Sequence, residues 1–208
     1  MADATGEIVT GAECLVGTLA DLGVAACFAN PGTSEMHLVT ALDREPRIRS
    51  VLCLFEGVAT GAADGYARVT GQPAMTLLHL GPGYQNGGAN IHNARRACSP
   101  MVNIVGDHAV SHRRHDAPLA SDITGLAAPN AHWVKSVDSA GDAGRLAAEA
   151  WVASFGPQPG PVSLVLPADS AWQQGGAHGP HLERPALRRI GADVIDEAVT
   201  AVRAASNL

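Results

Sequence analysis

Short apolar runs alternate with longer segments of mixed polarity over most of the chain. The apolar runs cover residues 24–29, 50–55, 74–80, 101–105, 132–137 and 161–166. Runs of this length, bounded by glycine, proline or charged residues, indicate buried strands. Segments long enough to form helices lie between them, at 33–43, 57–69, 83–97 and 142–155. This alternation predicts an α/β fold, a doubly wound and mostly parallel sheet with helices on both faces.

The two ends of the chain add to this pattern. Thr10 and Glu13 form a capping-box pair, and the apolar positions that follow have helical spacing until Gly23, so the first element is an amphipathic helix. Glycine, proline and histidine become frequent after residue 167. We expect one domain over residues 1–170, a linker over 171–192, and the start of a further domain, otherwise absent, over 193–208.

Composition narrows the function classes. The 208 residues are 46% hydrophobic, with a formal net charge of −6 and a pI near 5.8, which disfavours a nucleic-acid partner. The four cysteines form no CxxC pair and resemble reduced core residues. No signal peptide is visible, and no apolar run approaches the roughly 18 residues that a membrane span requires. We therefore expect a cytoplasmic protein that binds neither nucleic acid nor membrane.

The candidate functional residues come directly after predicted strands. In parallel α/β sheets, ligands bind beyond the carboxyl ends of the strands. Four stretches occur there: "NPGTSE" (30–35), Glu56, His79 with "GPGYQNGG" (81–88), and "GDHAVSHRRHD" (106–116). Glu56 is the only charged residue between Arg49 and Asp64. A carboxylate near a helix amino terminus is common, but apolar surroundings raise the pKa of a carboxyl group and let it hold and donate a proton. Such an acid would polarise a ring nitrogen well.

Four stretches together resemble the pyrimidine-binding domain of thiamine diphosphate-dependent enzymes of the acetolactate synthase and benzoylformate decarboxylase group. They are "CFANPGTSE", "FEGVATGAADGYARVTGQPA", "GPGYQNGGANIHNARRACSPMVNIVG" and "SDITGLAAPNAHWVKSV", in order between about residues 8 and 170. The resemblance implies that Glu56 hydrogen-bonds the pyrimidine ring of the cofactor and so activates its thiazolium carbon.

The resemblance assigns other residues with less specificity. It implies that Thr33 meets the substrate carboxylate, although a helix-capping role for its hydroxyl is an open alternative. His79 falls where the benzoylformate decarboxylase branch has an acid/base histidine, and a histidine hydrogen-bonded to a backbone carbonyl is the structural alternative. Further cofactor contacts are expected from five residues that follow two of the predicted strands: Pro31, Gly32, Gly81, Gly83 and Asn86.

Two other patterns in the sequence carry weaker hypotheses. "GPGYQNGG" is close to a dinucleotide fingerprint, but Asn86 stands where its third glycine would be. The spacing of His108, His112, His115 and Asp116 would suit zinc, yet two arginines between them would repel a cation, and we assign no metal ligand. An exposed loop at the mouth of the site is the preferred interpretation, with its arginines available to attract an anionic substrate.

The resemblance also implies partners. Related enzymes hold the diphosphate through Mg²⁺ bound to a GDG motif in another domain, and this sequence lacks that motif. We therefore expect the pyrimidine-binding half of a 2-oxo acid decarboxylase or carboligase, acting with a diphosphate-binding domain of the same or another chain in a homodimer or homotetramer. The alternatives are a non-catalytic assembly or regulatory module of the same fold, and a nicotinamide-binding domain.

Overall fold

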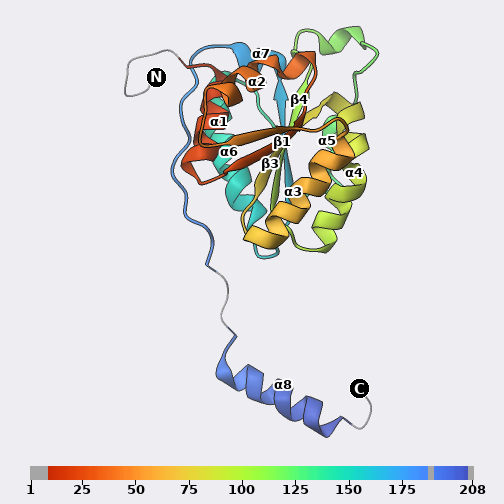
Figure 1. Cartoon of the computed structure of the whole chain (residues 1–208), viewed down its shortest axis with the longest axis vertical. Coiled ribbons are helices and arrows are strands. Elements are labelled where there is room, and N and C mark those ends of the chain that lie inside the picture. Colours follow the sequence, from red (N-terminus) through yellow and green to blue (C-terminus); the bar gives the residue numbers. More distant parts are fainter. Residues whose placement is uncertain (1–8, 187–189, 206–208) are drawn as a thin grey trace.

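A computed structural model describes residues 9–186 and 190–205. Six parallel strands form one sheet in the order β2-β1-β3-β4-β6-β5 (Figure 1). They are β1 (Ala26–Asn30), β2 (Arg49–Leu52), β3 (Ala74–His79), β4 (Met101–Asp107), β5 (Trp133–Ser136) and β6 (Pro161–Pro167). The expected parallel α/β fold is confirmed. The strand order reverses direction beside β1 and β3, so the connections place helices on both faces.

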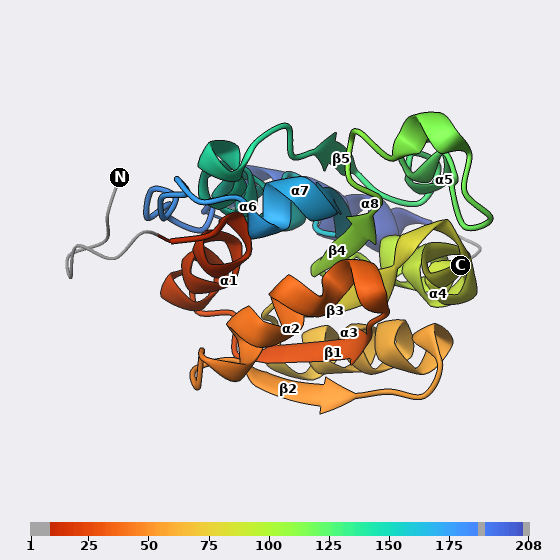
Figure 2. The same ribbon diagram turned by 90° about the horizontal axis from the view of Figure 1, so that it is seen from above.

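The helices form two layers, one on each face of the sheet, as Figure 2 shows. One layer contains α1 (Gly11–Asp21), α2 (Met36–Asp43), α6 (Ala140–Ser154) and α7 (Ala168–Trp172). The other contains α3 (Glu56–Thr70), α4 (Leu80–Arg96) and α5 (Ile123–Ala127). A separate hydrophobic core fills the space between each layer and the sheet. Two 3-10 turns, η1 (Thr33–Glu35) and η2 (Arg113–His115), complete the domain.

The ends of the first helices follow from local chemistry. The Thr10 amide donates to Glu13 Oε2 at 2.9 Å, and the Glu13 amide donates to Thr10 Oγ1 at 3.3 Å, so the predicted capping box forms. Gly23 follows α1 with a φ of 86°, and Gly71 ends α3 with a φ of 68°. Glycine adopts this left-handed conformation without steric cost.

Two strands differ from the expectation that all are buried. β2 and β5 occupy the edges of the sheet, and most of their residues are exposed or half-buried. Leu52 of β2 is 71% exposed. The prediction of burial was wrong for these two strands because an edge strand has a neighbour on one side only. The central strands β4 and β6 are buried throughout.

The segment after α7 runs along the α1 and α6 side of the domain, as the blue trace in Figure 1 shows. The Gly179 amide donates to Thr18 Oγ1 at 2.8 Å, and the Arg184 guanidinium lies 4.2 Å from the centre of the Phe155 ring. Helix α8 (Ala192–Ala204) follows the described part of this segment, and all of its residues are exposed. Its apolar residues at helical spacing are Val194, Ile195, Val199 and Val202.

Cysteines Cys14, Cys27 and Cys53 are buried and Cys98 is exposed, and all four are free thiols. Burial raises the pKa of Cys27 to about 12. Within residues 9–186 and 190–205, no helix has the length and apolar character to cross a membrane.

Candidate active site

Glu56 is the first residue of α3, and its side chain is buried. Asn86 of α4 donates to Glu56 Oε2 at 3.0 Å. A Cβ atom at Gly83 would lie 3.1 Å from Glu56 Oε1, so the absence of a side chain there lets the carboxyl group lie close to α4. The structure thus brings together Glu56, Gly83 and Asn86, three of the predicted cofactor residues.

Glu56 has apolar neighbours in the sequence, but these neighbours do not bury its side chain. Leu54 is 91% exposed, and Phe55 and Val58 also face solvent. Helix α4 covers the carboxyl group instead. Glycines allow α3 and α4 to approach closely, and small polar side chains form hydrogen bonds between them. Thr60 Oγ1 lies 3.0 Å from the Gly87 carbonyl oxygen, to which it donates. Asn90 Nδ2 donates to the Gly57 carbonyl at 2.7 Å.

These contacts explain the glycine-rich stretch that resembles a dinucleotide fingerprint. The stretch begins inside α4, which starts at Leu80 instead of at residue 83 as predicted. Gly83 faces Glu56, and Gly87 faces Thr60 at a position where a Cβ atom would lie 2.8 Å from a methyl group. Gly81 packs against Ser121, on the side of α5 and away from Glu56. Close packing against α3 therefore accounts for Gly83 and Gly87, and packing against the loop before α5 accounts for Gly81, whereas a Cβ atom at Gly88 would meet open space.

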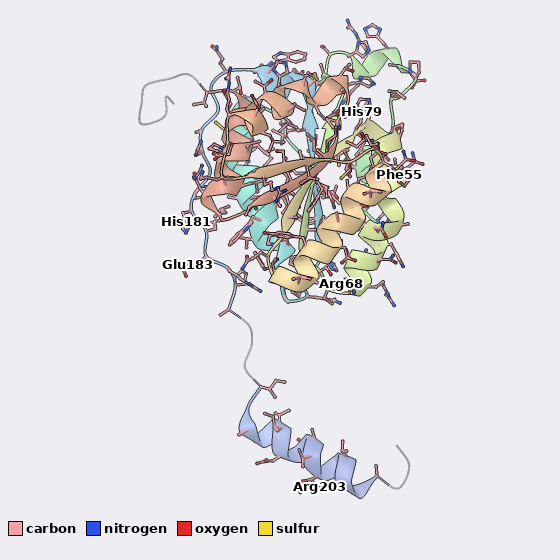
Figure 3. All side chains as sticks on the ribbon, viewed as in Figure 1. Phe55, Arg68, His79, His181, Glu183 and Arg203 are labelled. Atoms are coloured by element: carbon pink, nitrogen blue, oxygen red, sulfur yellow. The ribbon has the colours of Figure 1, made fainter. Side chains whose placement is uncertain are left out.

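His79 ends β3 at a sharp junction between strand and helix. The next residue, Leu80, is buried and has a φ of 54°, a left-handed conformation that is unfavourable for leucine. The His79 side chain is 22% exposed, and its Nδ1 lies 2.7 Å from Glu35 Oε2. Its partner is thus a carboxylate and not the backbone carbonyl of the structural alternative. Figure 3 labels His79 together with Phe55, the residue before Glu56.

His79 opens onto a cavity of about 420 Å³, which we call the histidine cavity. Thr33 belongs to its wall, and Gly32 rather than Thr33 occupies the cap position of η1. Apolar and polar groups both line it: Thr33, Ser34, His79, Leu80, His108, Ala109, Ser111, His112, Leu119, Ala168 and Trp172. The cavity lies beyond the carboxyl ends of β1, β3, β4 and β6.

Gly83 connects the two parts of the site. A Cβ atom built there would lie 3.1 Å from Glu56 Oε1 and 3.4 Å from His79 Cβ. Glu56 itself does not line the histidine cavity. Glu56, the predicted cofactor contact, and His79, the predicted acid/base residue, therefore lie on either side of Gly83. Gly32 packs against the His79 ring, whereas Pro31 lines a different groove beside β2.

The loop after β4 contributes residues that sequence reasoning placed only at the mouth of the site. His108 and His112 line the cavity, and their ring centres are 5.2 Å apart. The His115 ring lies 5.4 Å from that of His112. Arg113 is paired with Asp107 at 2.7 Å, so its charge is already balanced. In the described part of the chain, no three His, Cys, Asp or Glu side chains are grouped closely enough to hold a metal ion.

Glu35 contacts His79 in the structure and was not predicted from the sequence as a site residue. It is fully buried at the end of η1, and burial raises the pKa of its carboxyl group, opposed by hydrogen bonding from the Gly32 amide and His79. The sequence held one signal for it: Glu35 lies three residues after Gly32, a spacing that lets a side chain reach back to that amide. Its contact with His79 spans 44 residues, and no local pattern reveals it.

Comparison with known proteins identifies the family of this domain. The family model described as "Thiamine pyrophosphate enzyme, N-terminal TPP binding domain" matches residues 9–126. A Mycobacterium tuberculosis protein named "Putative acetolactate synthase large subunit IlvX" is 57% identical over 167 residues, covering 80% of this chain and 32% of that protein. The acetolactate synthase isozyme 3 large subunit of Escherichia coli is 34% identical over 164 residues, with 78% and 28% covered.

A solved structure gives the same result. The thiamine diphosphate-dependent 4-hydroxybenzoylformate decarboxylase of Rhodococcus jostii RHA1 superposes with a TM-score of 0.83 at 26% identity, covering 96% of this chain and 38% of that one. The chain thus spans about a third of the length of the proteins it matches. The buried glutamate at the start of α3, the parallel sheet and these matches agree, and the chain belongs to the thiamine pyrophosphate enzyme family through its N-terminal cofactor-binding domain.

Proposed function

We propose that this domain binds the pyrimidine end of thiamine diphosphate in an enzyme that decarboxylates a 2-oxo acid, with or without transfer of the product to a second carbonyl compound. The observation that carries the proposal is the buried Glu56 carboxyl group at the start of α3, which lies against Gly83 and accepts a hydrogen bond from Asn86. A buried acid bonded to a single side-chain amide retains capacity for a further hydrogen bond.

The residues of the chain have distinct proposed roles. Glu56 shares a proton with a pyrimidine nitrogen, and Asn86 holds the Glu56 carboxyl group in place. His79 exchanges a proton with the substrate in the histidine cavity, while Thr33 donates its hydroxyl hydrogen to the substrate carboxylate. Leu80, Leu119, Ala168 and Trp172 exclude water from the apolar part of the substrate. When bound, the cofactor supplies the nucleophilic carbon and the electron sink for decarboxylation.

A second domain is proposed for the diphosphate and its Mg²⁺ ion. The matched proteins are about three times as long as this chain, and the sequence lacks the GDG motif. We propose that residues 1–170 form the pyrimidine-binding domain, 171–192 a linker, and 193–208 the start of a central domain. The exposed apolar side chains of α8 support this division because such a face needs a partner.

The isolated 208-residue chain is expected to bind thiamine diphosphate weakly or not at all, because charge-assisted contacts to the diphosphate supply much of the affinity. Isothermal titration calorimetry with and without Mg²⁺ measures this. Micromolar, Mg²⁺-dependent binding would show that the chain holds a complete cofactor site and would contradict the proposed division of labour.

We also propose that the domain associates with a second copy. Leu52, Leu54, Phe55 and Val58 are exposed between 49% and 91%, and Val69 lies further along α3 with 88% exposure. Exposed apolar groups of this density mark protein interfaces. Sedimentation velocity is expected to show concentration-dependent dimers, and Leu54→Ser with Phe55→Ser should shift them to monomer. A profile that stays monomeric at high concentration would count against this interface.

A further inference from the structure

A fully buried carboxylate lies beneath the histidine cavity, at the point where β1, β3 and β4 end side by side. Glu35 Oε2 accepts a hydrogen bond from the Gly32 amide at 2.7 Å and lies 2.7 Å from His79 Nδ1. Glu35 Oε1 has no hydrogen-bond partner within residues 9–186 and 190–205. Most buried polar atoms in native proteins are paired, so this exception calls for a reason other than stability.

Two glycines create the room for the Glu35 and His79 pair. A Cβ atom at Gly106 would lie 1.7 Å from Glu35 Oε1, and one at Gly32 would lie 2.4 Å from His79 Nδ1. Neither distance is possible between non-bonded atoms. Gly106 is also the register partner of His79 across β3 and β4. Three separate segments of the chain are therefore shaped around this one contact.

The contact also fixes how the ring is turned. Nδ1 faces the buried carboxylate, so the exposed part of the ring is the side that carries Nε2, and His79 lines the cavity. While Glu35 is ionised its oxygens can only accept hydrogen bonds, so Nδ1 carries the proton when the His79 ring is neutral. Nε2 is then the free acceptor. A second proton on Nε2 gives a cation whose charge lies next to Glu35.

We infer that Glu35 is the positioning residue of His79: it holds the proton on Nδ1 and so directs Nε2 toward the substrate as the atom that takes and returns a proton. This inference rests on the proposed function of His79. When Nε2 takes a proton, Glu35 balances the positive charge, and when Nε2 returns it, the Nδ1–H bond to Glu35 remains. A carboxylate in this role contributes roughly 10⁴-fold to turnover in the serine proteases, chiefly by selecting the tautomer.

The test measures the tautomer directly by nitrogen NMR of the purified protein labelled with ¹⁵N-histidine. At about pH 9, where a histidine of ordinary pKa is neutral, wild-type His79 is expected to show a protonated Nδ1 and an unprotonated Nε2. Glu35→Met, which keeps the length of the side chain and removes the acceptor, should yield a substantial Nε2–H population. Glu35→Gln, which retains an acceptor oxygen, should restore much of the wild-type tautomer. A wild-type His79 with an unprotonated Nδ1 would overturn the inference without any variant.

The chain offers a matched control at its surface. His178 Nδ1 lies 2.8 Å from Asp21 Oδ2, a contact of the same kind in which both side chains are more than 40% exposed. Glu35→Met should leave the His178 signals unchanged, and Asp21→Asn should leave those of His79 unchanged. If Glu35→Met does not fold, the wild-type and Glu35→Gln spectra still decide between the outcomes.

Turnover of the complete enzyme separates this inference from the proposed function. Glu35→Met should lose most of the activity that His79→Ala loses, and the double variant should be no worse than His79→Ala alone, because Glu35 acts through His79. Additive losses would overturn the positioning role. Wild-type turnover in His79→Ala would instead refute the proposed function of His79, whatever the tautomer measured.

Discussion

Replacing Glu56 with glutamine in the complete enzyme is expected to slow exchange of the cofactor C2 proton by orders of magnitude and to lower turnover with it. Glutamine keeps the shape of the side chain and a hydrogen-bond donor, but it cannot pass a proton to the pyrimidine ring. Asn86 would still hold the side chain against α4. Cofactor binding should therefore survive in part. NMR of C2 deuterium exchange measures the effect.

Glu56→Asp should be nearly as impaired, because a side chain shorter by one methylene withdraws the carboxyl group further than a hydrogen bond tolerates. Glu13→Gln is the matched control, since Glu13 also lies in the first turn of a helix and serves as a cap. A carboxylate at a helix end contributes about 0.3–1 kcal/mol to stability and nothing to exchange. Exchange at the wild-type rate in Glu56→Gln would refute the catalytic assignment.

His79→Ala in the complete enzyme is expected to reduce turnover by roughly 10²- to 10⁴-fold, the contribution of one positioned proton-transfer group. Cofactor affinity should change little, because His79 faces the histidine cavity and Gly83 separates it from Glu56. Steady-state kinetics and a cofactor titration measure the two effects.

His178→Ala provides the control for this variant. That ring contacts Asp21, the last residue of α1, and does not line the histidine cavity, so turnover should be unchanged. Thermal unfolding of both variants distinguishes lost chemistry from lost folding. If His79→Ala keeps its rate, or if instability explains its whole loss, His79 has a structural role only.

The sequence predicted the sheet and its long helices well, because buried parallel strands appear as short continuous apolar runs and amphipathic helices as a period of 3.6 residues. The capping box of α1 and the glycine that ends it are chemical signals of the same local kind. Helices α5 and α7 were not predicted. Each has five residues, which is too few for a period of 3.6 to emerge.

The site was predictable where motifs are local and less so where it depends on packing. Glu56 stood out because it is an isolated charge, yet α4 buries it while its apolar neighbours face solvent. The helix was predicted to start at residue 83, after a turn, whereas it starts at Leu80 and packs against α3. Glu35 was missed because its environment comes from Gly106 and His79, which are brought to it by the sheet.

The two ends of the folded domain, residues 9–11 and 173–176, are hydrogen-bonded to each other. Gly175 and Gly176 both donate to the Val9 carbonyl at 3.2 Å, and the Gly11 amide donates to the Gln173 carbonyl at 3.1 Å. Thr10 and Gln174 form an antiparallel bridge. The chain thus enters and leaves this unit at one corner. A unit whose ends meet can be inserted, exchanged or circularly permuted without moving any strand. In evolution, such a domain can be joined to different partner domains without loss of its own fold.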